Sequence, residues 1–305
     1  MNVYDKIGMV RKYHPYLIYA KGIDWTENMN KKKKRKTLSN RLFVIIEVLC
    51  VLIFIYASLQ LVSIYQDYHR ASEEYNKLAD QVIIVEKKDV AEELAGTEEN
   101  NKEQKESEIL DLPYDYEVSR YSVDLDAMKK QNADTIGWII LPDSKINYPI
   151  LKSKDNAEYL TTTFEGQTSS SGAIFVDMLC ESDFSNENTI IYGHNMKNGS
   201  MFRALNNLTD KEYFWRHHIF CIDIGNGFEN YEIISCYETV DTDLSSWQIS
   251  FDSKEAYAAW LDVVAKRCSY DCVDYDVNKN TITLSTCRGQ AGSSGRFIVH
   301  LQKKD

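Results

Sequence analysis

The sequence lacks an excess of basic residues, and this limits the partners it can have. Its 305 residues carry a formal net charge of −11 at pH 7. Binding to nucleic acid needs a concentrated basic surface, so nucleic acid is excluded as the main partner. The basic residues cluster near the N-terminus ahead of a long apolar run, and the acidic excess follows that run.

The chain also lacks a dense cysteine framework, an internal repeat and a low-complexity tract. Its seven cysteines show no short framework spacing, and a domain of this size can bury a core without disulfides. Zinc is not expected, because no histidine stands near the neighbouring Cys268 and Cys272. Cys221 and Cys236 lie in strand-like runs, where buried free thiols are common. No special role is expected of Cys180, Cys268 or Cys272, and the disulfide status of the non-catalytic cysteines stays open.

One long apolar run is present, from Leu42 to Tyr65. It is long enough to cross a bilayer core of roughly 30 Å as a helix. A basic stretch at 31–36 precedes it, so residues 1–41 are predicted to be cytoplasmic and the rest of the chain extracellular. No convincing cleavage site follows, which favours an uncleaved single-pass membrane anchor at 42–65. From Met29 onward the chain has a short basic segment followed directly by the apolar run, as anchored proteins usually do. A further hypothesis is therefore that translation starts at Met29.

The remainder divides into two parts by composition. Residues 66–112 are polar and strongly acidic, and we expect them to form an extracellular stalk. Residues 113–305, which begin at Pro113, are expected to form one compact domain. The apolar content of 44% is enough for a real core.

The pattern of this domain predicts a mainly β fold, an antiparallel β-barrel with helical insertions. Strands are expected over 136–141, 146–151, 173–176, 188–192, 218–224, 231–240, 281–286 and 295–301. Short helices are expected over 123–130, 155–163, 201–205 and 210–217. A longer helix before the cysteine strand spans 253–267, with Ser253 as its N-cap.

A strand that ends in a thiol is the first candidate for chemistry. Thr281 to Thr286 alternates polar and apolar residues, which predicts one buried and one polar face, with Cys287 at its end on the polar side. The glycines and serines of 288–294 suit a hairpin loop leading to the next strand. A cysteine acts as a nucleophile only as a partly exposed thiolate, and a strand end beside a loop provides that exposure.

The catalytic histidine has to be chosen among six. His194 follows a hydrophobic strand, and Gly193 before it is expected to permit an unusual backbone that brings the imidazole to the surface. The other five suit other roles, because they lie in the cytoplasmic segment, the stalk, a helix–strand junction or a strand interior: His14, His69, His217, His218 and His300.

Two arginines compete for a role beside the thiol. A guanidinium stays charged and can hold a carbonyl or a developing oxyanion. Arg296 begins the strand that follows the hairpin loop, whereas strand alternation turns Arg288 away from the face of Cys287. A surface ion pair is the simpler alternative for either arginine.

These residues resemble a known family. The segment Thr283-Leu284-Ser285-Thr286-Cys287 looks like the active-site signature of sortases, the membrane-anchored cysteine transpeptidases of Gram-positive surfaces. Tyr192-Gly193-His194-Asn195-Met196 and Arg296-Phe297-Ile298-Val299-His300 stand at the family's order and spacing. The serine in the signature, Gly137-Trp138-Ile139, Asp155-Asn156 with Tyr159-Leu160, and the long helix resemble class B. The resemblance covers roughly residues 115–303.

The resemblance implies a closed β-barrel without metal or cofactor. In it Cys287 is the nucleophile, His194 the acid/base and Arg296 the stabiliser of the oxyanion or carbonyl. The substrate is a secreted protein with a C-terminal sorting signal of the Asn-Pro-x-Thr or Pro-x-Thr type, cleaved after threonine, and a peptidoglycan amine resolves the thioacyl enzyme. By matching position, the residues that hold the sorting peptide are Ser285, Tyr192, Asn156 and Leu160.

Two departures from the family pattern bear on substrate preference more than on mechanism. Arg288 replaces an acidic residue often found after the cysteine, and the loop from Cys287 to Arg296 is rather short. Two alternatives stay open: a pilin-polymerising sortase, in which the amine is a pilin lysine, and a membrane-anchored peptide-binding module without catalysis.

Overall fold

The computed structural model describes residues 25–84, 121–152, 154–268, 270, 272, 274–289 and 292–304. The chain divides into two compact units, residues 1–64 and 65–305. The predicted domain start at Pro113 and the later part of the predicted stalk, 85–112, lie outside the described residues.

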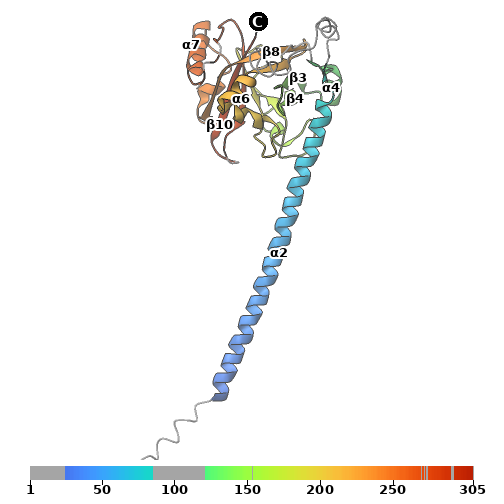
Figure 1. The fold of residues 1–305 in the computed structure, drawn as a ribbon, viewed down its shortest axis with the longest axis vertical. Coiled ribbons are helices and arrows are strands. Elements are labelled where there is room, and N and C mark those ends of the chain that lie inside the picture. Colours follow the sequence, from blue (N-terminus) through green and yellow to red (C-terminus); the bar gives the residue numbers. More distant parts are fainter. Residues whose placement is uncertain are drawn as a thin grey trace, which may run out of the picture. The chain divides into compact units, whose positions relative to one another are not determined.

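Helix α2, Trp25–Ala79, contains the predicted membrane anchor (Figure 1). Its segment from Asn40 is long and apolar enough to cross a membrane, and the apolar side chains between Leu42 and Tyr65 are exposed. From Tyr65 onward the helix belongs to the second unit.

The start of the predicted stalk differs from expectation, because it packs onto the domain. Ala71, Tyr75 and Leu78 are only 1%, 5% and 2% exposed. Their spacing places them on one helical face, and burying that face fixes the last turns of α2. Exposed positions such as Glu73, Asn76 and Lys77 account for much of the segment's polar composition, although Glu74 is buried with the apolar side chains.

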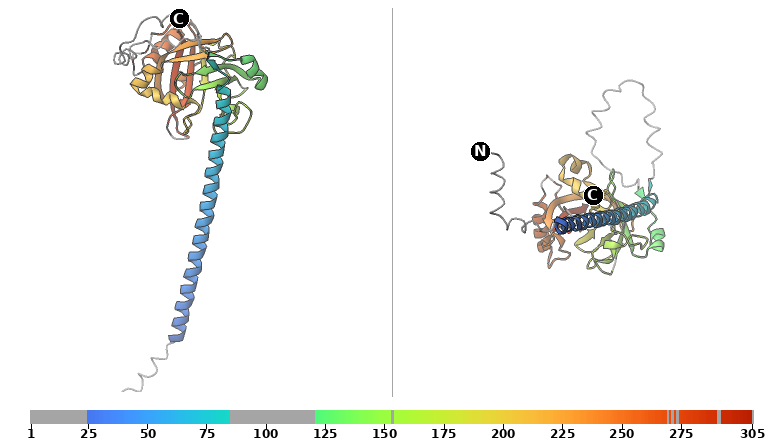
Figure 2. Two further views of the ribbon diagram at one scale, coloured as in Figure 1. Left: turned by 45° about the vertical axis from the view of Figure 1, so that its right-hand side comes forward. Right: turned by 90° about the horizontal axis from the view of Figure 1, so that it is seen from below.

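The predicted mainly β fold with a closed barrel is confirmed (Figures 1 and 2). The barrel strands are β3 Thr135–Ile140, β4 Asn147–Lys152, β5 Ile174–Val176, β6 Asn188–Tyr192, β7 Ile219–Asp223, β8 Phe228–Val240, β9 Thr281–Cys287 and β10 Gly295–Lys303. They close in the order β10-β8-β7-β3-β4-β5-β6-β9. A separate two-stranded sheet pairs β1, Ile83–Ile84, with β2, Tyr121–Ser122.

The barrel is not wholly antiparallel. β4 pairs with β5, and β6 with β9, in parallel. Parallel neighbours need a crossover connection, and long segments of the chain provide it in both cases. The β6–β9 pair matters most for function, because it brings residues about ninety positions apart to one end of the barrel.

Six helices of this domain lie among the described residues. They are α4 Leu125–Gln131, α5 Glu158–Thr161, the 3-10 helix η3 Phe202–Thr209, α6 Lys211–Arg216, the 3-10 helix η4 Leu244–Trp247 and α7 Lys254–Ala265. Five of the six overlap predicted helices, whereas η4 was not predicted. The predicted N-cap is confirmed, since Ser253 Oγ accepts a hydrogen bond from Ala256 N at 3.2 Å.

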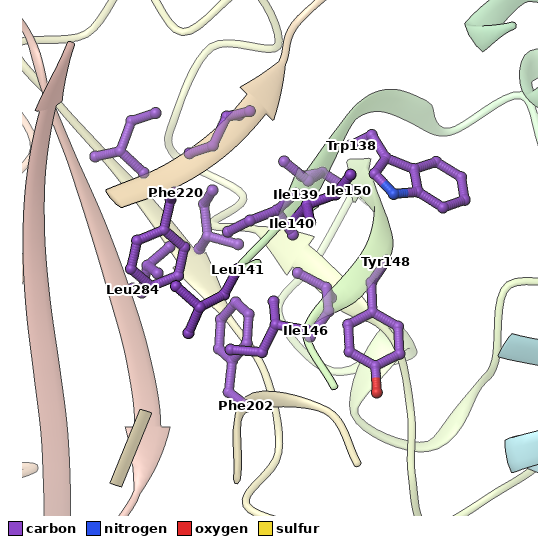
Figure 3. Close-up of a cluster of buried hydrophobic side chains, with 14 of the residues drawn as sticks. Trp138, Ile139, Ile140, Leu141, Ile146, Tyr148, Ile150, Phe202, Phe220 and Leu284 are labelled. Carbon is purple, nitrogen blue, oxygen red and sulfur yellow. The ribbon is translucent and has the colours of Figure 1, made fainter. Parts of the chain in front are cut away.

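Buried hydrophobic side chains of the barrel strands and helices form two clusters. The larger fills the barrel, where side chains from β3, β4, η3, β7 and β9 meet, including Ile139, Phe202, Phe220 and Leu284 (Figure 3). In the smaller, Tyr257, Trp260 and Leu261 of α7 pack against Ile234 of β8 and Ile298 of β10, which are neighbouring strands.

Strand β9 is buried on both faces, which corrects the expectation of one polar face. Thr281, Thr283 and Ser285 are at most 3% exposed. Their hydroxyls find partners inside the fold, such as Tyr257 for Thr281 and Asn188 for Thr283. The polar residues at alternate positions of β9 therefore form hydrogen bonds inside the fold and do not contact solvent.

The structure answers the question of disulfide status that the sequence left open for the non-catalytic cysteines. Cys268 and Cys272 form a disulfide. Helix α7 ends at Ala265, so the chain turns after it and brings the two side chains together. Cys221 and Cys236 are free and buried, as expected from their strand-like runs, and Cys180 is free and buried as well.

Candidate active site

Cys287 ends strand β9 and is partly exposed. The other free thiols of the barrel are buried, and burial raises the pKa of Cys180 to about 11 and those of Cys221 and Cys236 to about 12. Because the thiolate is the nucleophilic form, Cys287 is the free cysteine of the described barrel that suits covalent chemistry.

Cys287 lines a cleft of about 410 Å³. All seven site residues predicted from the sequence line this cleft: Cys287, His194, Arg296, Ser285, Tyr192, Asn156 and Leu160. Six further residues line it: Phe175, Gly193, Asp241, Leu244, Trp247 and Thr286.

The barrel topology explains why these residues meet. Strands β6 and β9 run in parallel, with Tyr192 opposite Ser285, so His194 and Cys287 follow at the same end. Strand β10 starts beside the end of β9, with Arg296 opposite Cys287. The order along this end of the barrel is therefore histidine, cysteine, arginine.

His194 has a fixed imidazole. Its Nε2 lies 2.8 Å from the carbonyl oxygen of Leu160. A carbonyl oxygen only accepts hydrogen bonds, so Nε2 carries a proton and donates it. Nδ1 is then the nitrogen that can gain or release a proton during catalysis.

Gly193 is required for space and not for an unusual backbone. It does not adopt a positive φ, in contrast to the sequence expectation. A Cβ atom at this position would lie 2.5 Å from Ile174 Cδ1 and 2.6 Å from Phe202 Cδ2. Residues 193–201, between β6 and η3, are here called the histidine loop. The missing side chain of Gly193 lets the start of this loop pass against the barrel core.

The other described histidines of the barrel are engaged elsewhere. His300 is fully buried between Thr283 Oγ1 at 2.8 Å and Tyr237 Oη at 2.9 Å. Burial, with a smaller contribution from the charge of Arg267, lowers the pKa of His300 to about 3. His217 is buried and His218 lies 3.7 Å from Glu232; neither residue lines the cleft.

Arg296 is held from two sides. Its Nη1 donates to the carbonyl oxygens of Ser293 at 2.8 Å and Gly295 at 2.9 Å. Its Nη2 lies 3.3 Å from Asp241 Oδ2, and Asp241 also lines the cleft. The guanidinium is thus oriented at the edge of the cleft beside Cys287.

Arg288 points away from the cleft, as strand alternation predicted. Its guanidinium contacts Glu238 at 2.7 Å and Asn206 Oδ1 at 3.0 Å, and lies 5.9 Å from the ring centre of Phe297. It therefore makes a local ion pair and does not line the cleft with Arg296.

Tyr192 and Asn156 meet on a buried carboxylate. Tyr192 Oη and Asn156 Nδ2 each donate to Asp177 Oδ2 at 2.9 Å. Burial, reinforced by the charge of Asp177, raises the pKa of Tyr192 well above its usual value, so it stays a neutral donor. Asp177 was not predicted as a site residue, because a single aspartate after a short strand fits many roles.

A further part of the cleft lining comes from the segment between β8 and α7. Trp247 Nε1 donates to Ser285 Oγ at 3.1 Å, so the predicted Ser285 is held by a residue that sequence reasoning missed. Leu244 is 78% exposed and Leu160 is 40% exposed, and both line the cleft. No periodic pattern places Trp247 or Leu244, since they lie in a short 3-10 helix.

Asn195 is a further residue that the sequence did not single out, although it stands next to His194. Its Nδ2 donates to the carbonyl oxygen of Cys287 at 2.8 Å, and its Oδ1 accepts from Arg203 Nη1 at 3.0 Å. This amide links the histidine loop to the backbone of the nucleophile.

Comparison with known proteins agrees with this geometry. A family model described as the sortase domain matches residues 139–304. Sortase B of Listeria monocytogenes is 36% identical over 56% of this chain and 70% of its own length. Sortase B of Staphylococcus aureus is 30% identical over 58% and 73%.

Solved structures give the same result. The crystal structure of sortase B from B. anthracis in complex with AAEK1 superposes with a TM-score of 0.59 at 26% identity. The match covers 79% of this chain and 99% of that one. The chain therefore belongs to the sortase family of cysteine transpeptidases, with its likeness to class B.

Proposed function

We propose that this protein cleaves a C-terminal sorting signal of the Asn-Pro-x-Thr or Pro-x-Thr type after threonine and transfers the protein to a peptidoglycan amine. The observation that carries the proposal is the single cleft that contains Cys287, His194 and Arg296. These are the residue types that acyl transfer through a thioester requires.

The first half-reaction forms the thioacyl enzyme. The Cys287 thiolate attacks the threonine carbonyl carbon, and Arg296 donates hydrogen bonds to the developing oxyanion. Protonated His194 gives its Nδ1 proton to the leaving amine nitrogen, so the peptide C–N bond breaks as the thioester forms.

The second half-reaction reverses these roles. An incoming amine attacks the thioester carbonyl, and neutral His194 accepts a proton from the attacking nitrogen. The C–S bond breaks, the Cys287 thiolate leaves and a new amide bond forms. No metal or cofactor takes part.

The peptide occupies the cleft. Tyr192, Asn156 and Leu160 contribute one part of its lining, and Ser285 contributes another. Tyr192 and Asn156 are fixed by Asp177, which makes that part of the lining rigid before the peptide binds.

The apolar segment of α2 anchors the enzyme as a single-pass membrane protein, with the N-terminus in the cytoplasm and the catalytic domain outside. The length and apolar character of the helix support the anchor, and the basic residues before it support the orientation.

The test is turnover of a fluorogenic sorting-signal peptide by the full chain in detergent, with and without an added amine. We expect Cys287→Ala to abolish cleavage and transfer, while Cys50→Ala in the apolar segment keeps both. Turnover by Cys287→Ala would refute the proposal. Mass spectrometry of the product made on cells separates a peptidoglycan amine from a pilin lysine.

A further inference from the structure

The last turns of α2 make a polar contact with the loop between α5 and β5, residues 162–173, here called the α5–β5 loop. Both partners belong to the unit 65–305. Three side chains of the helix bind this loop: Arg70 Nη2 donates to Thr168 O at 3.1 Å, Asp67 Oδ2 accepts from Ser170 Oγ at 2.7 Å, and Glu74 Oε1 accepts from Glu165 N at 2.9 Å.

Tyr75 is the buried centre of this contact, at 5% exposure. Its hydroxyl donates to Gly172 O at 2.7 Å and accepts from Phe164 N at 3.2 Å. Its ring meets the ring of Tyr148 edge to face, with 5.3 Å between centroids. A phenol that uses its hydroxyl and its ring in this way fixes two segments relative to each other.

One route from Tyr75 leads to the backbone of His194. Tyr148, at the margin of the core in Figure 3, accepts a hydrogen bond from Met201 N at 2.9 Å. Met201 has a φ of +55°, a conformation rare for this side chain, and it pairs with Asn195. The next residue, Phe202, donates its N–H to His194 O at 2.9 Å.

A second route leads to the imidazole. Gly172 has a φ of +56°, and a Cβ there would lie 2.3 Å from Tyr159 O and 2.8 Å from Leu160 O. The neighbouring Ala173 N donates to Tyr159 O at 2.9 Å. Leu160 O in turn accepts the Nε2 proton of His194. The segment that orients the imidazole therefore packs directly on the residue that Tyr75 binds.

We propose that the docked end of α2, through Tyr75 and Tyr148, is the positioning element of the catalytic histidine. The proposal rests on the proposed function, in which His194 moves the proton. Proton transfer requires hydrogen-bond distance between imidazole and substrate nitrogen, so a small displacement of the histidine lowers the rate without weakening peptide binding.

The segment between the membrane anchor and the barrel is thus part of the catalytic support. A cleft of about 360 Å³ is lined by both tyrosines. Its lining also includes Ala71, Ser72 and Asn76 of α2 and Asn198 and Ser200 of the histidine loop. The ring contact at this cleft joins α2 to the tyrosine that binds Met201 N.

The test uses Tyr75→Phe and Tyr148→Phe in the full chain in detergent. Each variant keeps the ring and removes the hydroxyl. We expect kcat for peptide cleavage to fall about tenfold with KM unchanged, because a misplaced catalytic group slows chemistry and not binding. The pH profile of kcat, measured over the pH range in which each variant stays folded, should also shift, which a general loss of stability would not cause.

Tyr257→Phe is the matched control. Tyr257 is also a buried tyrosine, its hydroxyl binds Lys279 O at 2.8 Å, and it does not line the active-site cleft. It should lose stability but keep kcat and the pH profile. If Tyr75→Phe and Tyr148→Phe behave like Tyr257→Phe, the positioning role is refuted.

A double-mutant cycle separates this proposal from the proposed function. In a His194→Ala background, which retains a low residual rate, Tyr148→Phe should cause no further loss if it acts through the histidine. An equal loss in both backgrounds overturns the positioning role and leaves the function intact. Full activity of His194→Ala would refute the catalytic assignment itself, and the positioning role with it.

Discussion

Acid should destabilise this protein through one buried residue, His300. The residue is fully buried, and its environment requires the neutral imidazole: Tyr237 and Thr283 bind its nitrogens, and the ring of Trp260 lies 5.2 Å away. The charged Arg267 contributes to the same effect. The pKa falls from 6.5 to about 3 on folding, so the unfolded chain binds the proton first.

The sign and window follow from these two values. Above pH 6.5, His300 does not lower the free energy of unfolding. As the pH falls from 6.5 toward 3, the unfolded chain binds the proton and the free energy of unfolding decreases. At pH 4.5, two pKa units below the unfolded value, the loss is about 3 kcal/mol at roughly 1.4 kcal/mol per unit. This is a large share of the roughly 5–15 kcal/mol typical of a folded domain.

The assay is urea unfolding of the full chain in detergent, followed by tryptophan fluorescence at pH 7.5 and pH 4.5. Carboxylates also titrate in this range. The comparison is therefore with His300→Gln, which has the same carboxylates as the wild type and lacks only the imidazole. The wild type should lose about 3 kcal/mol more than His300→Gln between the two pH values. Equal losses in the two proteins would refute the account of His300 as a buried neutral histidine.

Two further predictions concern the cleft. Gly193→Ala should lower the free energy of unfolding by about 1–3 kcal/mol and reduce kcat, because its Cβ would overlap Ile174 and Phe202 at the base of the histidine loop; an unchanged melting temperature would contradict this. Alkylation of the folded enzyme with iodoacetamide at neutral pH should label Cys287 and leave Cys180, Cys221 and Cys236 unmodified, as peptide mapping would reveal.

The sequence predicted the elements of the barrel well, because their signals are local. Alternation marked β9 and the hairpin to β10, and Ser253 marked the start of α7. The placement of Cys287, His194 and Arg296 in one cleft agrees with the prediction, since each stands at a strand end.

What the sequence missed depends on contacts between distant segments. Asp241 and Trp247 lie between β8 and α7 without a periodic pattern, yet they reach Arg296 and Ser285. Because the segment after the anchor is strongly acidic, it was predicted to be a solvated stalk, and the buried helical face around Tyr75 was missed. Alternation in β9 suggested a solvated face, because nothing local reveals that α7 packs over the neighbouring strands.

The parallel pairing of β6 with β9 has a consequence for when activity can arise during synthesis. His194 leaves the ribosome long before Cys287, and the two meet only when the β9–β10 hairpin inserts between β6 and β8. Closing such a long loop is slow compared with forming local hairpins. The nucleophile therefore joins its partners only after this hairpin has paired, and we expect a chain that lacks the hairpin to have no transpeptidase activity.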